Sequence, residues 1–201
     1  WYFTSNGMIR KSLANTQTAL KGFNGIIYDY QKEALNYAAA IALNTELKQY
    51  LAAENTGGIS GLLDPLRRQL KIDLMMITDG QGKVICQWPD PVDGGRGIED
   101  QLFLNAALTG NSAAGFGRKA TGGLLACAGV PIRDGAGRVR GAVITGFGLD
   151  KKTVVDQVKD LFRTDATLFM NDIRVATTIS ENGERVVGTR MNKDIAEIVL
   201  A

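Results

Sequence analysis

Apolar residues recur at alternating steps of three and four along the first quarter of the chain. The stripe consists of Leu20, Phe23, Ile27, Tyr30, Ala34, Tyr37 and Ile41. Proline is absent from residues 8–53 and alanine is abundant, so this seven-residue repeat predicts one helix of about 60 Å over that range. Gly57-Gly58 is predicted to end the helix, and Ile59–Leu70, with Pro65 near its start, is predicted to form a second, short helix.

Three later stretches share a different pattern, in which an apolar strand, a tight polar turn with glycine and a second apolar strand follow one another. They are Ile77–Ile85, Ile132–Arg140 and Ile179–Val187. Their turns contain the Asp, Asn and Gly residues that tolerate the backbone dihedrals of hairpins. The pattern predicts an antiparallel sheet at the centre of the molecule.

The remaining elements follow from the same two periodicities. Strands are predicted at 73–78, 83–88, 113–119, 124–132, 139–146, 166–170, 173–178 and 185–188, and helices at 99–108, 150–163 and 192–201. Asp150 is the predicted N-cap of the second of these helices. Strands gathered between helices indicate the α+β class.

Composition removes several classes of function. The chain has 201 residues and is 45% apolar, which suffices for one domain with a real core. Its 23 Lys and Arg against 21 Asp and Glu leave a net charge of +2 without a basic stripe, so nucleic acid is not expected as a partner. Histidine is absent, which removes Ser-His-Asp and Cys-His catalysis and the commonest metal ligand.

The candidate chemistry is sparse. Cys86 and Cys127 form no C-x-x-C motif and are interpreted as small apolar residues rather than redox or zinc ligands. Neither the carboxylates nor the thiols make a catalytic set, so we expect no catalytic residues, no metal, no cofactor and no enzymatic activity. Arg118 and Lys119, next to Phe116, provide donors for a carboxylate, or else a solvated charged pair at a sheet edge. Trp88 either caps a pocket or packs under the following loop.

The order of these blocks resembles that of the Cache domains. The resemblance rests on Ile77–Val84, Gly129–Phe147 with its Pro-Ile-Arg-Asp, Thr167–Thr177 with Phe-Met-Asn-Asp-Ile-Arg-Val-Ala-Thr, and Val187–Arg190. The chain is most similar to the single Cache type of bacterial chemoreceptors and sensor kinases. That family implies a long N-terminal helix plus a short second helix over residues 1–72, a PAS-like five-stranded sheet over 73–190, and a C-terminal segment over 191–201 that leads toward a membrane span or a further region.

The resemblance also implies a small ligand held in the hollow of the sheet. Citrate-binding members keep cationic side chains at positions that correspond here to Val84, Gln87, Cys127 and Gly129, so citrate is not the expected ligand. Ile144 replaces a serine, and Thr121 retains a hydroxyl. The implied ligand-binding residues are Met76, Val84, Gln87, Trp88, Phe116, Arg118, Lys119, Thr121, Cys127 and Ile144. In the implied strand order Cys86 and Cys127 fall on opposite edges, too far apart for a disulfide.

These observations lead to one expected function and one alternative. We expect a periplasmic or extracytoplasmic sensor domain of a bacterial transmembrane signal transducer, most naturally a methyl-accepting chemotaxis receptor. It would bind a small metabolite such as a short monocarboxylate and form a homodimer through its N-terminal helix. Trp1-Tyr2-Phe3 is typical of the end of a membrane span, which suits a membrane-anchored parent, or is a chance cluster. The alternative is a ligand-free interaction or dimerisation module of a sensor kinase or cyclase.

Overall fold

The computed structural model describes the backbone of residues 2–89, 102–119 and 123–199. Side chains are described for 17–89, 102–119 and 123–197. The chain forms two compact units, one of Asp29–Gly148 and one of Trp1–Tyr28 together with Leu149–Ala201. These units divide the chain differently from the expected boundaries after residues 72 and 190, because residues 29–72 pack on the sheet and share its core.

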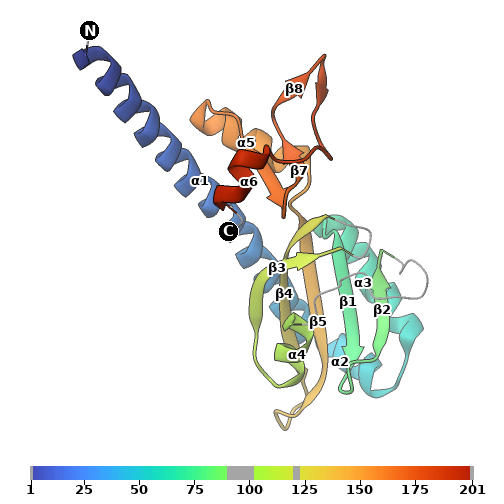
Figure 1. The fold of residues 1–201 in the computed structure, drawn as a ribbon. Helices are drawn as coiled ribbons and strands as arrows, with labels where there is room; N and C mark the ends of the chain where they lie inside the picture. The colour runs from blue at the N-terminus through green and yellow to red at the C-terminus, as the bar shows by residue number, and fades with distance from the viewer. Residues whose placement is uncertain (1, 90–101, 120–122, 200–201) are drawn as a thin grey trace. The chain divides into compact units, whose positions relative to one another are not determined.

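The centre of the larger unit is a five-stranded antiparallel sheet (Figure 1). Its strands are β1 (Leu74–Asp79), β2 (Val84–Trp88), β3 (Ala113–Arg118), β4 (Leu124–Arg133) and β5 (Val139–Gly148), in the order β2-β1-β5-β4-β3. The first two predicted hairpins join β1 to β2 and β4 to β5, and Gly82 and Gly137 have φ of +79° in their turns. Glycine adopts such positive φ values without a steric penalty. The prediction of these two hairpins is therefore confirmed, together with the backbone requirement on which it was based.

Three helices precede the sheet, and their bounds correct the sequence prediction. The single helix predicted over 8–53 is in fact α1 (Tyr2–Leu43) and α2 (Thr45–Ala52), because the Asn44 side chain accepts a hydrogen bond from Leu47 N at 2.9 Å and starts a new helix. Helix α3 (Thr56–Leu70) begins before Gly57-Gly58 instead of after it. Asn55 caps that first turn, and a side chain at Gly58 would collide with the Tyr50 ring, so this glycine allows α2 and α3 to pack together.

One face of the sheet, called here the helix face, packs against α1, α2 and α3. Its buried residues are Met75, Ile77, Ala128, Val130, Ile132, Val143 and Phe147 from the strands and Ile72, which precedes β1. Phe147 packs beneath two tyrosines of α1, with ring centroids 6.1 Å from Tyr30 and 6.0 Å from Tyr37. The predicted apolar stripe of the first helix therefore covers this face along residues 30–41.

One buried hydrogen bond ties the sheet to α1. Thr145 is fully buried in β5, and its Oγ1 donates to the carbonyl oxygen of Ala34 over 2.7 Å. We expect Thr145→Val to lower the free energy of unfolding by about 1 kcal/mol, because shape is kept while the donor is lost. Urea unfolding measures the change; Thr145→Ser, which keeps the hydroxyl, is the control. Equal stability of the valine variant and the wild type would contradict this role.

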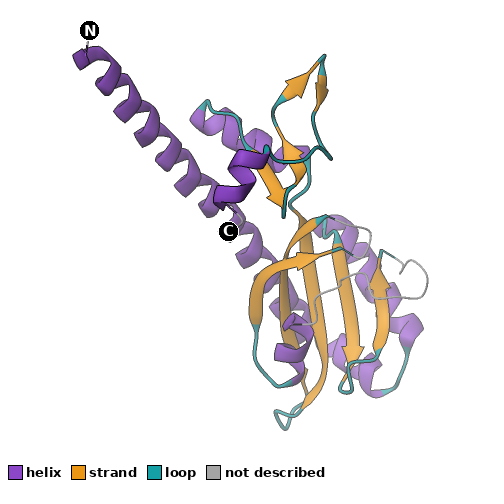
Figure 2. Ribbon diagram, viewed as in Figure 1, coloured by secondary structure: helices purple, strands orange, loops and turns teal. Residues whose placement is uncertain are grey.

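The smaller unit contains the last elements of the chain (Figure 2). They are α5 (Lys152–Phe162), β6 (Thr167–Met170), β7 (Ile173–Thr177), β8 (Ser180–Glu181), β9 (Glu184–Arg185) and α6 (Lys193–Val199). The third predicted hairpin forms the β8–β9 pair, which is separate from the five-stranded sheet. The N-cap of α5 is Lys151, without a side-chain capping bond, rather than the predicted Asp150.

An apolar cluster and an ion pair hold this unit together. Buried Val155 and Val158 of α5 join Ala166 and Ala176, and Phe23 of α1 packs against them. Arg185 Nη2 reaches Asp156 Oδ1 at 2.6 Å and so links β9 to α5. Both partners are partly exposed, so packing rather than this ion pair supplies most of the stability.

Candidate functional site

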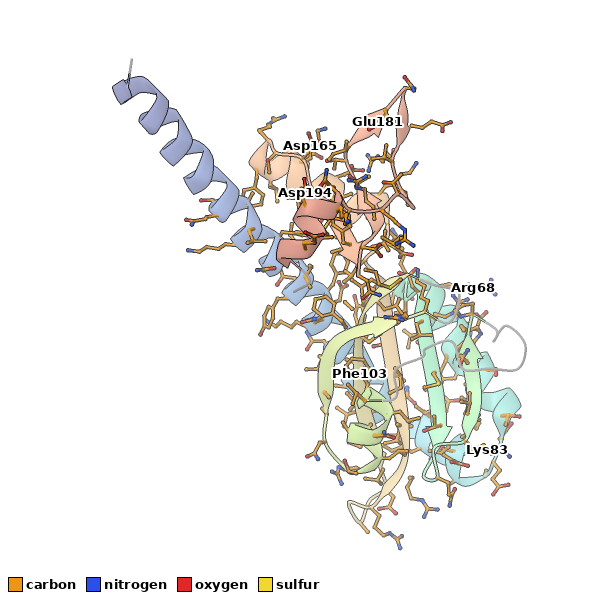
Figure 3. All side chains as sticks on the ribbon, in the orientation of Figure 1. Arg68, Lys83, Phe103, Asp165, Glu181 and Asp194 are labelled. Carbon is orange, nitrogen blue, oxygen red and sulfur yellow. The ribbon has the colours of Figure 1, made fainter. Side chains whose placement is uncertain are left out.

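The face of the sheet opposite the helix face carries α4 (Leu102–Leu108) and is called here the α4 face. Its buried residues are Leu74, Met76, Leu125, Cys127, Ala142 and Ile144 from the strands and Phe103, Leu104 and Ala107 from α4. Figure 3 labels Phe103, which lies over β4 and β5. A Cβ at Gly129 would lie 2.4 Å from the carbonyl oxygen of Phe103, so the helix backbone rests directly on this strand.

A β-bulge determines which residues of β2 lie on the α4 face. Ile77 is opposite Cys86, yet Thr78 is opposite Val84, so Ile85 is the extra residue. Simple alternation would put Val84 and Gln87 on opposite faces. The bulge places both on the α4 face, Gln87 beside Met76 and Val84 beside Thr78.

Two polar side chains on this face have buried oxygen atoms without a hydrogen bond from any described residue. Thr78 is fully buried and its Oγ1 has no such partner. Gln87 is 6% exposed; its Nε2 donates to the carbonyl oxygen of Pro89 over 3.3 Å, while its Oε1 has no such partner. A buried polar atom without a hydrogen bond destabilises the folded state by about 1–3 kcal/mol. Two such atoms flank Met76, and a ligand that forms hydrogen bonds with them would remove this cost, so they are a candidate binding feature.

The structure brings half of the expected site residues together. Met76, Val84, Gln87, Cys127 and Ile144 all belong to the α4 face. Sequence reasoning missed Thr78, although its position two residues after Met76 in one strand was the available signal. These five residues therefore share one face of the sheet, and ligand binding there stays a prediction.

Four of the other five expected site residues lie elsewhere, and the fifth is outside the described residues. Trp88 is opposite Met75 and belongs to the helix face, where the Arg67 guanidinium lies 5.9 Å from its ring centroid. Phe116 and Arg118 alternate with Gly115 and Gly117, so they project from the exposed edge strand on the side away from α4. Lys119 follows β3 and is half-buried, and Thr121 lies outside the described residues.

The Arg67 contact gives Trp88 a structural role. Asp64 pairs with Arg67 at 3.0 Å and with Arg68 at 2.6 Å, and these hydrogen bonds lower the pKa of its carboxyl. Asp64 thus holds the Arg67 guanidinium over the Trp88 ring. This arrangement joins α3 to the edge strand β2 on the helix face.

The two cysteines are free thiols. Burial raises the pKa of Cys86 to about 12, so almost none of it is thiolate at neutral pH. Cys127 is fully buried on the α4 face. It lies on β4, one strand in from the edge, which corrects the expectation that both cysteines occupy edge strands; two strands still separate them.

Neither a cluster of metal ligands nor a membrane-spanning helix is found in the described ranges. Residues 2–89, 102–119 and 123–199 contain no group of three or more Cys, Asp or Glu side chains placed to hold a metal ion. None of the helices described there combines the length and the apolar character that crossing a bilayer requires.

Comparison with known proteins gives this architecture a class. Residues 147–201 match the family model of the single Cache domain 3, whereas no curated protein matches the chain. The sensor domain of E. coli DcuS is 20% identical, with a TM-score of 0.56 over 67% of this chain and 98% of that one. The sensor domain of the V. cholerae histidine kinase DctB is 13% identical, with a TM-score of 0.64 over 86% of this chain and 69% of that one.

A chemoreceptor has the same fold. The sensory domain of Campylobacter jejuni Tlp3, solved with isoleucine bound, is 14% identical, with a TM-score of 0.53 over 88% of this chain and 74% of that one. The fold is therefore that of the Cache sensor domains of histidine kinases and chemoreceptors, which confirms the predicted α+β, PAS-like architecture. The resemblance to the single Cache type is confirmed by the family model over the C-terminal part.

Proposed function

We propose that the chain is the extracytoplasmic ligand-sensing domain of a bacterial membrane-anchored signal transducer, most naturally a methyl-accepting chemotaxis receptor. Support for the class comes from the Cache fold, which it shares with the chemoreceptor Tlp3. In this proposal the domain binds a small molecule on its α4 face, acts without catalysis or cofactor, and forms a homodimer through α1. Leu20 and Tyr28 are exposed apolar side chains of α1 that would serve this contact.

The observation that carries the ligand proposal is the pair of unmet oxygen atoms of Thr78 and Gln87 beside Met76. Gln87 Oε1 can only accept a hydrogen bond, whereas the Thr78 hydroxyl can accept one and donate one. A small amino acid is a short monocarboxylate that offers both complements, since its ammonium group donates and its carboxylate accepts. Met76 and Ile144 then contact the apolar part of the ligand.

A thermal-shift screen tests the proposal. We expect one or more small amino acids or short monocarboxylates to raise the melting temperature by about 5 °C at 100 times Kd, because a ligand that binds only the folded state stabilises it. Citrate should give no shift, since the described residues of this face include no pair of cationic side chains. A flat response across amino acids, organic acids and amines would contradict direct sensing.

A ligand-free interaction module is the second candidate. The dense packing of Phe103, Leu104 and Ala107 against β4 and β5 favours it, because that half of the α4 face is filled by the protein itself. In that case the partner is a protein and the input acts on the surface. A flat ligand screen together with a stable complex between this domain and an extracytoplasmic protein would establish this alternative.

A further inference from the structure

A cavity of about 740 Å³ lies at the hairpin end of the larger unit, away from Thr78 Oγ1 and Gln87. Three segments border it: the end of α2 with the start of α3, the β1–β2 turn, and the β4–β5 hairpin. Figure 3 labels Lys83, which stands in the first of these turns. We call this space the hairpin cavity.

The hairpin cavity has an apolar floor. Leu51 and Ile59 come from the helices, and Ile85, Ile132 and Val139 come from the strands. Ile59 and Ile132 are fully buried, so the floor is part of the core and is rigid. Such a floor suits the apolar body of a small molecule.

The charges around the rim are of two kinds. Some already hold the turns: Asp79 Oδ1 accepts from Gln81 N and Lys83 N at 2.9 Å, and Arg133 donates to the carbonyl oxygens of Gly137 and Gly110 at 2.7 Å. Asp134 is paired with Arg138 at 2.9 Å. These side chains therefore stabilise the backbone of the turns and hold its geometry fixed.

The other charged side chains of the rim make no hydrogen bond or ion pair with a described residue. They are Lys48 of α2, Lys83 of the β1–β2 turn, Arg140 of β5 and Glu54. Four cationic and three carboxylate side chains line the cavity, and Arg138 pairs with one of those carboxylates from outside it. The local charge is therefore close to +2. Thr56, the first residue of α3, adds the positive end of a helix dipole.

We propose that the hairpin cavity is a second ligand site, which binds a small organic dianion with an apolar body. Two negative charges complement the rim, and the body contacts the partly exposed side chains of Leu51, Ile85 and Val139. A phosphate monoester and an aromatic dicarboxylate share this chemistry. Val84 borders both this cavity and the α4 face, whereas Thr78 and Gln87 do not line the cavity, so either site can exist without the other.

Titration calorimetry of the full chain at pH 8 tests this proposal, with phenyl phosphate and phthalate as probes. Phenyl phosphate is a dianion at that pH, since its second pKa is about 6. We expect either probe to bind at least ten times more tightly than inorganic phosphate, which has no apolar body, or benzyl alcohol, which has no charge. Binding of only one probe identifies the anionic group that the site takes; binding of neither overturns the proposal.

Charge variants locate the site. Lys48 is half-buried, and Lys48→Gln is expected to weaken phenyl phosphate binding about tenfold. Lys83→Gln and Arg140→Gln, at exposed positions, should each weaken it about three- to fivefold. Lys32→Gln is the matched control, because Lys32 is an exposed lysine of α1 outside the cavity.

Two further measurements distinguish the hairpin cavity from the α4 face and from surface charge in general. Gln87→Leu should leave the affinity for phenyl phosphate unchanged, because Gln87 does not line the hairpin cavity. The proposal for the hairpin cavity can therefore hold even if the α4 face binds no ligand. Higher salt should weaken binding in the wild type more than in Lys48→Gln. Equal losses in Lys32→Gln and Lys48→Gln would mean general attraction to surface charge and would overturn the proposal.

Discussion

Replacing Gly129 by alanine is expected to lower the free energy of unfolding by about 3 kcal/mol, because overpacking by one methyl group has no space to relax. The new Cβ would lie 2.4 Å from the carbonyl oxygen of Phe103 and 2.9 Å from Ile144 Cδ1. The first contact is with backbone, which cannot rotate away. Helix α4 must therefore lift from β4, and Phe103, Leu104 and Ala107 lose burial together.

Urea unfolding followed by tryptophan fluorescence measures this change. Gly61→Ala is the control, because nothing lies within 4 Å of a Cβ at that position in α3. There alanine should raise the free energy of unfolding by about 0.5–1 kcal/mol, since it has the higher helix propensity. A loss below 1 kcal/mol in Gly129→Ala would mean that α4 is not held as closely as the structure shows.

Gln87→Leu is expected to separate ligand binding from stability. The substitution removes the unmet Oε1 and the long bond to Pro89, so the free energy of unfolding without ligand should stay within about 1 kcal/mol of wild type. Affinity for the strongest hit of the thermal-shift screen should nevertheless fall at least tenfold, about 1.4 kcal/mol, because the acceptor for its donor group is gone. Thr78→Val, which keeps the shape of the side chain, should reduce affinity in the same way.

Calorimetry with the same ligand distinguishes the outcomes. Gln69→Leu is the matched control, since Gln69 is an exposed residue of α3, and its affinity should equal that of wild type. Unchanged affinity in both Gln87→Leu and Thr78→Val would place the ligand elsewhere. A large loss of stability without ligand would instead assign Gln87 a structural role.

Local chemistry made much of the fold predictable. The Asp-Gly and Asn-Gly turns identified all three hairpins, because few residues adopt the dihedrals that such turns require. The stripe of the first helix identified the side that covers the sheet. The break at Asn44 was missed because no glycine or proline marks it, whereas a single side-chain capping bond starts a new helix there.

The candidate site was only half predictable, because its composition depends on register. Met76 of β1, Val84 and Gln87 of β2, Cys127 of β4 and Ile144 of β5 reach the α4 face as the family resemblance implied. Trp88 and Phe116 do not, since strand pairing turns them to the other side. Thr78 was missed because an unmet hydroxyl becomes visible only when its surroundings are known.

The extra residue in β2 has a consequence for how such domains diversify. Val84 and Gln87 share a face because the extra residue Ile85 is bulged out of the pairing between them. Removing Ile85 would restore strict alternation and leave Val84 opposite Thr78, on the same face as Gln87. The bulge thus lets the strand gain or lose one residue while the set of side chains offered to a ligand, and the rest of the sheet, stay in place.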